Sequence, residues 1–198
     1  MAELAHSSHK VRIYQEKNRL GMLLFVASEA SFFSILISAY IYYQGPLVPG
    51  PNASNSLHLP LTAIYTVCLL SSSLTMVMAG RSVERDDQRG TVVWLLATIL
   101  LGGIFLFGQV REYIGLLTEN IAPSTNLFGT TFFTLTGFHG LHVFGGLVAL
   151  AILTVLALAG DFKGARATPV EVVSIYWHFV DIVWVFIFSV VYLWPLFV

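Results

Sequence analysis

The sequence predicts an all-α membrane protein, built as a bundle of five transmembrane helices. Three observations carry this prediction. Of the 198 residues, 56% are hydrophobic and only 11% are charged, whereas soluble domains carry roughly 25% charged residues. The apolar residues gather in five runs of about 20 residues or more, the length that crosses a hydrocarbon core of about 30 Å. Lysine and arginine gather in alternate connections between these runs.

The five predicted helices follow one another along a single domain, residues 1–198. None of the runs alternates between polar and apolar residues, as a membrane-spanning strand would. A helix satisfies its backbone hydrogen bonds within the span, which lipid requires. The predicted helices cover residues 20–43, 59–80, 91–114, 127–159 and 170–197.

The basic residues predict the orientation of the chain in the membrane. Nine of the ten lie in the N-terminal tail, the second connection or the fourth connection. Because basic residues accumulate on the cytoplasmic side, we expect a cytoplasmic N-terminus and a periplasmic or extracellular C-terminus. An odd number of spans places the two termini on opposite sides, so helix count and charge distribution agree.

Composition also argues against several classes of function. The net charge of −1 does not favour a nucleic-acid partner. Cys68 is the only cysteine, which excludes an intrachain disulfide and a cysteine-based metal cage. The polar first eighteen residues and the long apolar run after them are not typical of a signal peptide, so we expect the N-terminus to be retained.

Apart from Glu171 at the very start of the fifth span, seven ionisable side chains lie inside the predicted spans, where each is costly and needs a reason. Depth along each helix, counted at 1.5 Å per residue, predicts an inner and an outer polar layer. The inner layer would contain Glu29, His178 and Asp181, and the outer layer Arg111, Glu112, His139 and His142. The two histidines of the fourth helix are three residues apart, as are His178 and Asp181, so each pair shares a helix face.

The residues alone leave three interpretations of these side chains open. They could form interhelical hydrogen bonds that hold the bundle together, which the glycines of the third and fourth helices favour because small residues permit close packing. They could form a proton relay or a lipid-headgroup site. The histidines could bind haem or a metal, although the repeated Glu-x-x-His pattern of di-iron bundles is absent.

Segments in all five predicted helices resemble the cytochrome c oxidase subunit III family. The longest are Gly137-Phe-His-Gly-Leu-His142 in the fourth helix and Trp177-His-Phe-Val-Asp181 in the fifth. Ser28-Glu-Ala-Ser-Phe-Phe33 resembles the family's motif around a carbodiimide-reactive buried glutamate. Gln109-Val-Arg-Glu-Tyr113 resembles its Gln-x-x-Glu-Tyr segment, and Ser72-Ser-Leu-Thr75 fits the helix between.

The resemblance implies a non-catalytic subunit of a proton-pumping haem–copper oxidase, which reduces oxygen to water in the cytoplasmic (inner) membrane of a bacterium. Subunits I and II would hold the haems and copper, and this chain would bind no haem and no metal. It would pack on subunit I, alone or within a larger respiratory supercomplex, bind structural phospholipid, and sustain proton uptake and turnover stability. The resemblance assigns the seven buried polar residues to these proton-uptake or lipid-associated roles.

The family resemblance also has implications for lipid binding. Longer members have seven helices, and their two additional N-terminal helices form one side of a V-shaped lipid cleft. This chain resembles the shorter five-helix form of many bacterial oxidases. We therefore expect another subunit to supply the second wall of such a cleft.

Other functions are compatible with the same residues. The chain could serve a quinol oxidase or accompany nitric oxide reductase, because subunits I and II choose the electron donor. A transporter or proton channel could use the same buried acids. A di-haem cytochrome b could use His139, His142 and His178 as ligands.

Overall fold

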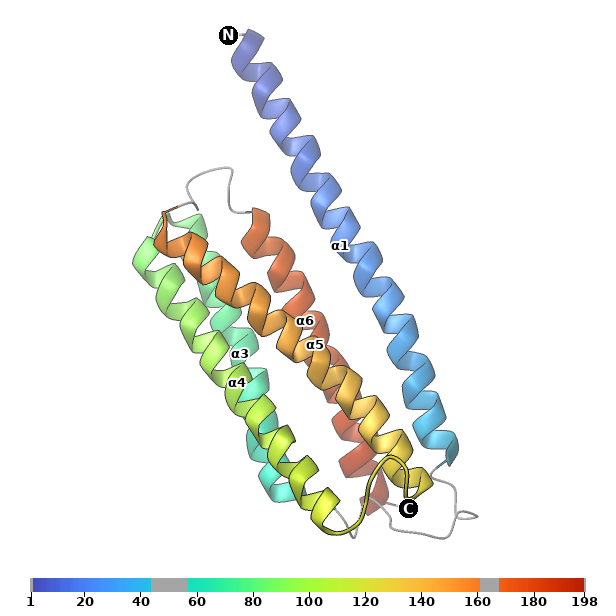
Figure 1. The fold of residues 1–198 in the computed structure, drawn as a ribbon. Coiled ribbons are helices and arrows are strands. Elements are labelled where there is room, and N and C mark those ends of the chain that lie inside the picture. Colours follow the sequence, from blue (N-terminus) through green and yellow to red (C-terminus); the bar gives the residue numbers. More distant parts are fainter. Residues whose placement is uncertain (1, 44–56, 161–167, 198) are drawn as a thin grey trace.

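The structure, a computed structural model, describes residues 2–43, 57–160 and 168–197, with side chains from Glu16 onward in the first helix. The described residues form long helices (Figure 1). The helices are α1 (Ala2–Tyr43), α3 (Leu59–Glu84), α4 (Gln88–Thr118), α5 (Leu127–Leu158) and α6 (Thr168–Phe188). A π-helical turn, η2 (Ser189–Leu193), and a 3-10 turn, η3 (Trp194–Leu196), continue α6.

The prediction of five membrane-spanning helices is confirmed, because five helices are long and apolar enough to cross a membrane. Most helices extend beyond the predicted ends by a few residues, and α1 begins at Ala2 rather than near residue 20. Charged residues such as Arg81 and Glu84 continue a helix past its apolar run, since both types are good helix formers. The basic residues of the fourth connection, Lys163 and Arg166, lie outside the described residues, and the orientation stays a prediction.

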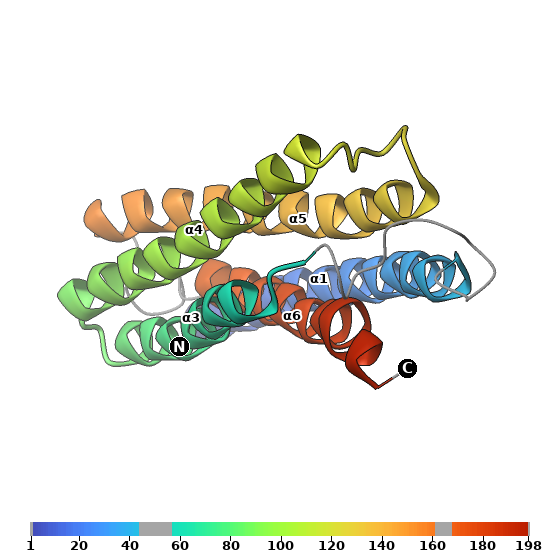
Figure 2. The same cartoon turned by 90° about the horizontal axis from the view of Figure 1, so that it is seen from below.

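The helices form two layers. Figure 2 shows α4 and α5 in one layer and α3, α6 and α1 in the other. Helix α6 is central, because it contacts α1, α3 and α5, whereas α1 packs on α5 and α6 at the edge of the bundle. Its edge position leaves most of α1 exposed, so few side chains attach it to the bundle.

Two connections that join neighbouring helices are built in the same way. Asp86 and Asn120 have positive φ angles of 55° and 60°. The residues after them, Asp87 and Ile121, donate their backbone N–H groups to carbonyls five residues back, at 2.9 and 3.0 Å. This arrangement is a Schellman motif, which ends a helix and satisfies its last carbonyls. Asp87 and Asn126 then cap the next helix through their side chains, at 3.0 and 2.6 Å from backbone nitrogens.

The indole of Trp177 fills the centre of the bundle between two glycines. A Cβ added to Gly102 of α4 would lie 2.8 Å from the indole, and one added to Gly146 of α5 would lie 2.7 Å from it. The indole Nε1–H donates to Ser72 Oγ of α3 at 2.9 Å. The fully buried side chain of Trp177 thus contacts α3, α4 and α5. On α4 and α5 only glycine leaves room for it.

We expect Gly146→Ala to destabilise the bundle by about 1–3 kcal/mol, because overpacking a filled core costs that much. The control is Gly103→Ala, since no atom lies within 4 Å of a Cβ at Gly103. Denaturant titrations of both variants in detergent, followed by circular dichroism, would compare their free energies of unfolding. Equal values for the two variants would contradict the close approach of Trp177.

Candidate functional site

The buried ionisable residues lie at two depths that differ from the prediction. Glu29 and His142 each lie at the middle of an apolar span, Glu16–Tyr43 and Leu127–Leu158 respectively. Asp181 lies near the middle of the span Thr168–Leu196, whereas Glu112 lies near the end of α4. Starting the first span at residue 20 had placed Glu29 too close to one end. The residues therefore form a mid-depth group and a group near one end of the bundle.

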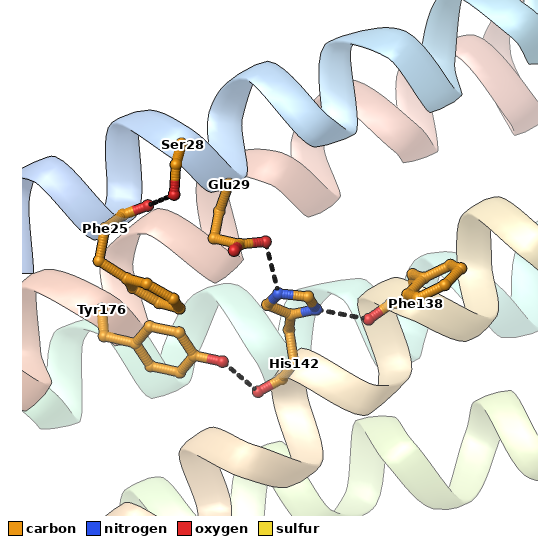
Figure 3. Close-up of polar contacts among 6 residues, drawn as sticks. All are labelled: Phe25, Ser28, Glu29, Phe138, His142 and Tyr176. Atoms are coloured by element: carbon orange, nitrogen blue, oxygen red, sulfur yellow. Dashed lines mark hydrogen bonds and ion pairs between the residues drawn. The ribbon is translucent and has the colours of Figure 1, made fainter.

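Glu29 and His142 bridge α1 and α5 at mid-depth. Figure 3 shows the carboxyl group of Glu29 pointing from α1 toward the imidazole of His142. The distance from Glu29 Oε2 to His142 Nε2 is 3.1 Å, and the other ring nitrogen, Nδ1, lies 2.7 Å from the backbone oxygen of Phe138. The side chains are 21% and 14% exposed, respectively, so the pair lies largely inside the protein.

The geometry of this pair fixes its proton count. A backbone carbonyl only accepts, so Nδ1 of His142 must carry the hydrogen that points at Phe138. One further proton then lies between Nε2 and Glu29 Oε2. If Glu29 holds that proton, both groups are neutral; if His142 holds it, the two form an ion pair. The pair has no net charge in either state, which suits a position in the middle of a membrane.

Aromatic side chains surround the Glu29–His142 pair. The ring of Phe33 meets the imidazole edge to face, with centroids 5.0 Å apart. Tyr176 of α6 donates its hydroxyl to the backbone oxygen of His142 at 2.9 Å, and its ring packs on Phe25 of α1 (Figure 3). These rings exclude water from most of the surroundings and strengthen the polar contact.

A second mid-depth group joins α3 and α6. Ser73 Oγ lies 3.0 Å from His178 Nδ1 and donates to Asp181 Oδ2 through a short hydrogen bond. Because the hydroxyl has one hydrogen and gives it to Asp181, its oxygen accepts from Nδ1–H of His178. Asp181 is 3% exposed, and its other oxygen, Oδ1, has no hydrogen-bond partner among the described residues. The three side chains form a short hydrogen-bonded chain from a half-buried imidazole to a buried carboxyl group.

A third group surrounds Glu112 near the C-terminal end of α4. Thr62 of α3 donates to Glu112 Oε1 at 3.1 Å, and Tyr192 donates to Oε2 at 2.6 Å. Tyr192 lies in the π-helical turn that follows α6. π-helical turns are frequent at functional sites. The carboxyl group is thus held from two sides by hydroxyl groups of two other elements.

A separate network joins α4 and α5 one turn away. Gln109 Nε2 donates to the backbone oxygen of Thr136 at 2.6 Å and to the Tyr113 hydroxyl at 3.1 Å. The Tyr113 hydroxyl and Thr136 Oγ1 lie 2.7 Å apart. The Gln-x-x-Glu-Tyr segment therefore supplies contacts to two different neighbours, with Gln109 and Tyr113 facing α5 and Glu112 facing α3 and η2.

His139 is fully buried, without a polar partner among the described side chains. Its ring stacks on Trp184 with centroids 4.9 Å apart, and Phe105 meets it edge to face at 5.8 Å. Neither ring nitrogen has a hydrogen-bond partner in the described part of the chain. Trp184 in turn donates its Nε1–H to Thr66 at 2.9 Å. In this structure His139 is a packing residue of the aromatic core.

The predicted grouping into an inner and an outer layer is wrong in separating Glu29 from His142, although His178 and Asp181 do lie in one group. Glu29 bonds to His142, which the prediction had placed in the other layer, whereas His178 and Asp181 bond to Ser73. Arg111 is exposed and makes no ion pair within the described residues. Depth along a helix does not reveal which neighbour a side chain faces, so counting residues could not have found these pairs.

The hydroxyl partners were not among the predicted site residues. Hydroxyl groups bind Asp181, Glu112 and Trp184. They belong to Ser73, Thr62, Tyr192 and Thr66. Hydroxyl groups on α3 in an otherwise apolar span were the available signal, but serine and threonine also satisfy themselves on their own helix backbone. Among the described residues, no group of three or more histidine, cysteine, aspartate or glutamate side chains could hold a metal ion.

Five apolar spans with ionisable residues paired in their interior define a multi-pass membrane protein. Comparison with known families specifies the class further. The family model for cytochrome c oxidase subunit III matches residues 1–196. The chain belongs to the cytochrome c oxidase subunit III family, as its Gly-Phe-His-Gly-Leu-His and Trp-His-Phe-Val-Asp segments indicate.

Curated relatives named cytochrome c oxidase subunit 3 are similar to this chain over most of its length. The probable cytochrome c oxidase subunit 3 of Nocardia farcinica is 38% identical over 87% of this chain and 86% of its own. Cytochrome c oxidase subunit 3 of Thermostichus vulcanus is 37% identical over 88% of this chain and 86% of its own. That of Synechocystis sp. is 36% identical over 96% of this chain and 79% of its own. These relatives are subunits of a terminal oxidase, which connects the family to respiration and electron transport.

We expect a double-mutant cycle of Glu29→Ala and His142→Ala to give a coupling energy of about 0.6–1.7 kcal/mol, the range measured for hydrogen bonds between helices in a membrane. The measurement is the free energy of unfolding of the two single variants and the double variant in detergent. The matched cycle of Glu29→Ala with His178→Ala should give a coupling below about 0.5 kcal/mol, as for sites without shared partners. The reverse order of the two coupling energies would contradict the pairing described above.

Proposed function

We propose that this chain is the non-catalytic subunit III of a proton-pumping haem–copper terminal oxidase in a bacterial cytoplasmic membrane. Subunits I and II hold the haems and copper, and this chain packs on subunit I without a redox centre of its own. The observation that carries the proposal is the family match over residues 1–196. The mid-depth polar groups, which lie in the motifs of the family resemblance, support a role in proton uptake and in the stability of the complex during turnover.

The Glu29–His142 pair connects these two roles. The pair holds one proton between two groups, and this proton can move from one group to the other without giving the pair a net charge within lipid. It also ties α1, which packs on the bundle by one face, to α5. Loss of the pair would therefore loosen the helix at the edge of the bundle and remove a proton-holding group at the same time.

A cavity between α1 and the beginning of α6 supports the binding of structural phospholipid. Its volume is about 460 Å³, and apolar side chains such as Met22, Phe25 and Val172 line it together with Lys17. An exposed ion pair lies close by in the sequence, with Arg19 3.6 Å from Glu171. A cation next to an apolar cavity at the end of a span matches the headgroup and acyl chain of a phospholipid.

Co-purification tests this function directly. An affinity tag on the chain should recover haem–copper oxidase subunits, with the haem absorbance of the complex in the visible spectrum. The chain expressed alone should show no Soret band. Haem retained by the chain alone would contradict the accessory role, and a partner without a dinuclear copper site would indicate a quinol donor in place of cytochrome c.

We expect Glu29→Gln to leave the haem content of the assembled oxidase unchanged and to shorten its working life or slow its proton uptake. Glutamine keeps the size of the side chain but cannot exchange the proton shared with His142. The control is Glu84→Gln, an exposed position at the end of α3. Turnover-dependent inactivation and proton uptake would be measured by oxygen consumption and pH-indicator absorbance in the purified complex. Loss of haem in Glu29→Gln alone would count against the proposal.

A further inference from the structure

A small cavity lies between the beginning of α3 and the end of α4, next to Glu112. Its volume is about 170 Å³. A single buried water needs roughly 10–15 Å³. The cavity is therefore much larger than one water molecule and has room for a small polar group. Its lining combines apolar, glycine and ionisable residues, among them Leu61, Tyr65, Arg111, Glu112, Gly115 and Glu119.

The carboxyl group of Glu112 is held in one orientation at this cavity. Thr62 and Tyr192 each donate a hydrogen bond to a different carboxyl oxygen, at 3.1 and 2.6 Å. The backbone of His58 supplies a further hydrogen bond to this carboxyl group. A carboxylate has about four lone-pair sites, so one remains for another donor. Both hydroxyl donors are uncharged, and Glu112 forms no ion pair with any residue that the structure describes. Among the described residues, no side chain with a permanent positive charge donates to Glu112, and the nearest titratable cation in the lining is the imidazole of His58.

Arg111 supplies a permanent positive charge in the same lining, which also contains a second acid, Glu119. Arg111 lies next to Glu112 along the lining and, within the described residues, has no acidic partner. A guanidinium group binds phosphate well through its forked donors. The lining thus presents a fixed carboxyl group for an ammonium and a guanidinium group for a phosphate.

We propose that this cavity binds the headgroup of a phospholipid with a primary amine, its ammonium on Glu112 and its phosphate on Arg111. The proposal rests on the lipid-binding part of the proposed function. It adds a second lipid site and the chemical class of the headgroup bound there. Exposed apolar side chains of the same two helices, Ile64, Ile114 and Leu117, are available for the acyl chains. A headgroup with a quaternary ammonium has no N–H to donate, and one without an amine leaves Glu112 unpaired.

Lipid retention by the intact oxidase tests the proposal. The complex is purified into nanodiscs of phosphatidylethanolamine, phosphatidylglycerol or phosphatidylcholine, and the lipids that stay bound after transfer to detergent are counted by native mass spectrometry. We expect phosphatidylethanolamine to be retained roughly tenfold better than the other two, the factor that one charge-assisted hydrogen bond supplies. Equal retention of the three lipids would overturn the proposal.

Two glycines of α4 provide a matched pair of variants. No atom lies within 4 Å of a Cβ at Gly115, which lines the cavity, or at Gly103, which does not. Gly115→Leu should fill the cavity and remove the preference for phosphatidylethanolamine, whereas Gly103→Leu should retain it. Leucine is favoured over glycine in a helix, so both variants should fold. A preference that survives in Gly115→Leu would overturn the proposal.

Two further measurements distinguish a bound lipid from a soluble headgroup, and headgroup binding from assembly of the oxidase. Free phosphoethanolamine carries the same headgroup without acyl chains, and we expect millimolar concentrations of it not to displace the lipid. Complete displacement would assign the cavity to a soluble zwitterion and overturn the lipid assignment. Co-purification of the oxidase subunits with Gly115→Leu reports on assembly independently, so failure of the headgroup site and failure of the accessory role are distinguishable.

Discussion

The constraint on which the structure depends is the absence of water from the membrane interior. A polar group in a span gains from a partner inside the protein, because an unpaired one costs several kcal/mol in lipid. The two buried tryptophans of α6 meet this constraint by donating to hydroxyl groups of α3, at Ser72 and Thr66. Both bonds also position α6 between its neighbours. Hydrogen bonding and close packing on glycine thus fix the same helix in the same place.

The same constraint explains why ionisable residues occur in combinations. Glu29 and His142 share one proton, so neither has to carry an uncompensated charge. Arg111, which always carries its charge, is exposed near the end of α4 rather than at mid-depth. Among the described residues, the arginine side chains thus lie toward the ends of the bundle, whereas Glu29 and His142 lie at mid-depth as a pair without net charge.

The sequence predicted the number of helices well, because the length and apolar character of a span can be counted along the chain without knowing which helices touch. From the cost of charge in lipid it also predicted that Asp181 and His139 are buried, but it wrongly placed Arg111, which is exposed, in the same class. The partners of these residues could not be predicted in the same way. The pairing of Glu29 with His142 depends on which faces of α1 and α5 meet, and this depends on contacts between residues far apart in the chain. The hydroxyl donors Ser73 and Thr62 were missed because their type does not distinguish a bond to a neighbour from a bond to their own helix.

The placement of α1 links stability to function. This helix exposes most of its surface, so its attachment relies on a few contacts, among them Phe33, Tyr40 and the Glu29–His142 pair. A helix held this weakly could be released without unfolding the other four, which α6 holds together through its own contacts with α3 and α5. In an assembled oxidase, contacts with another subunit would add to the attachment of α1. The Glu29–His142 pair therefore lies on the least buried of the five spans and contributes to its attachment.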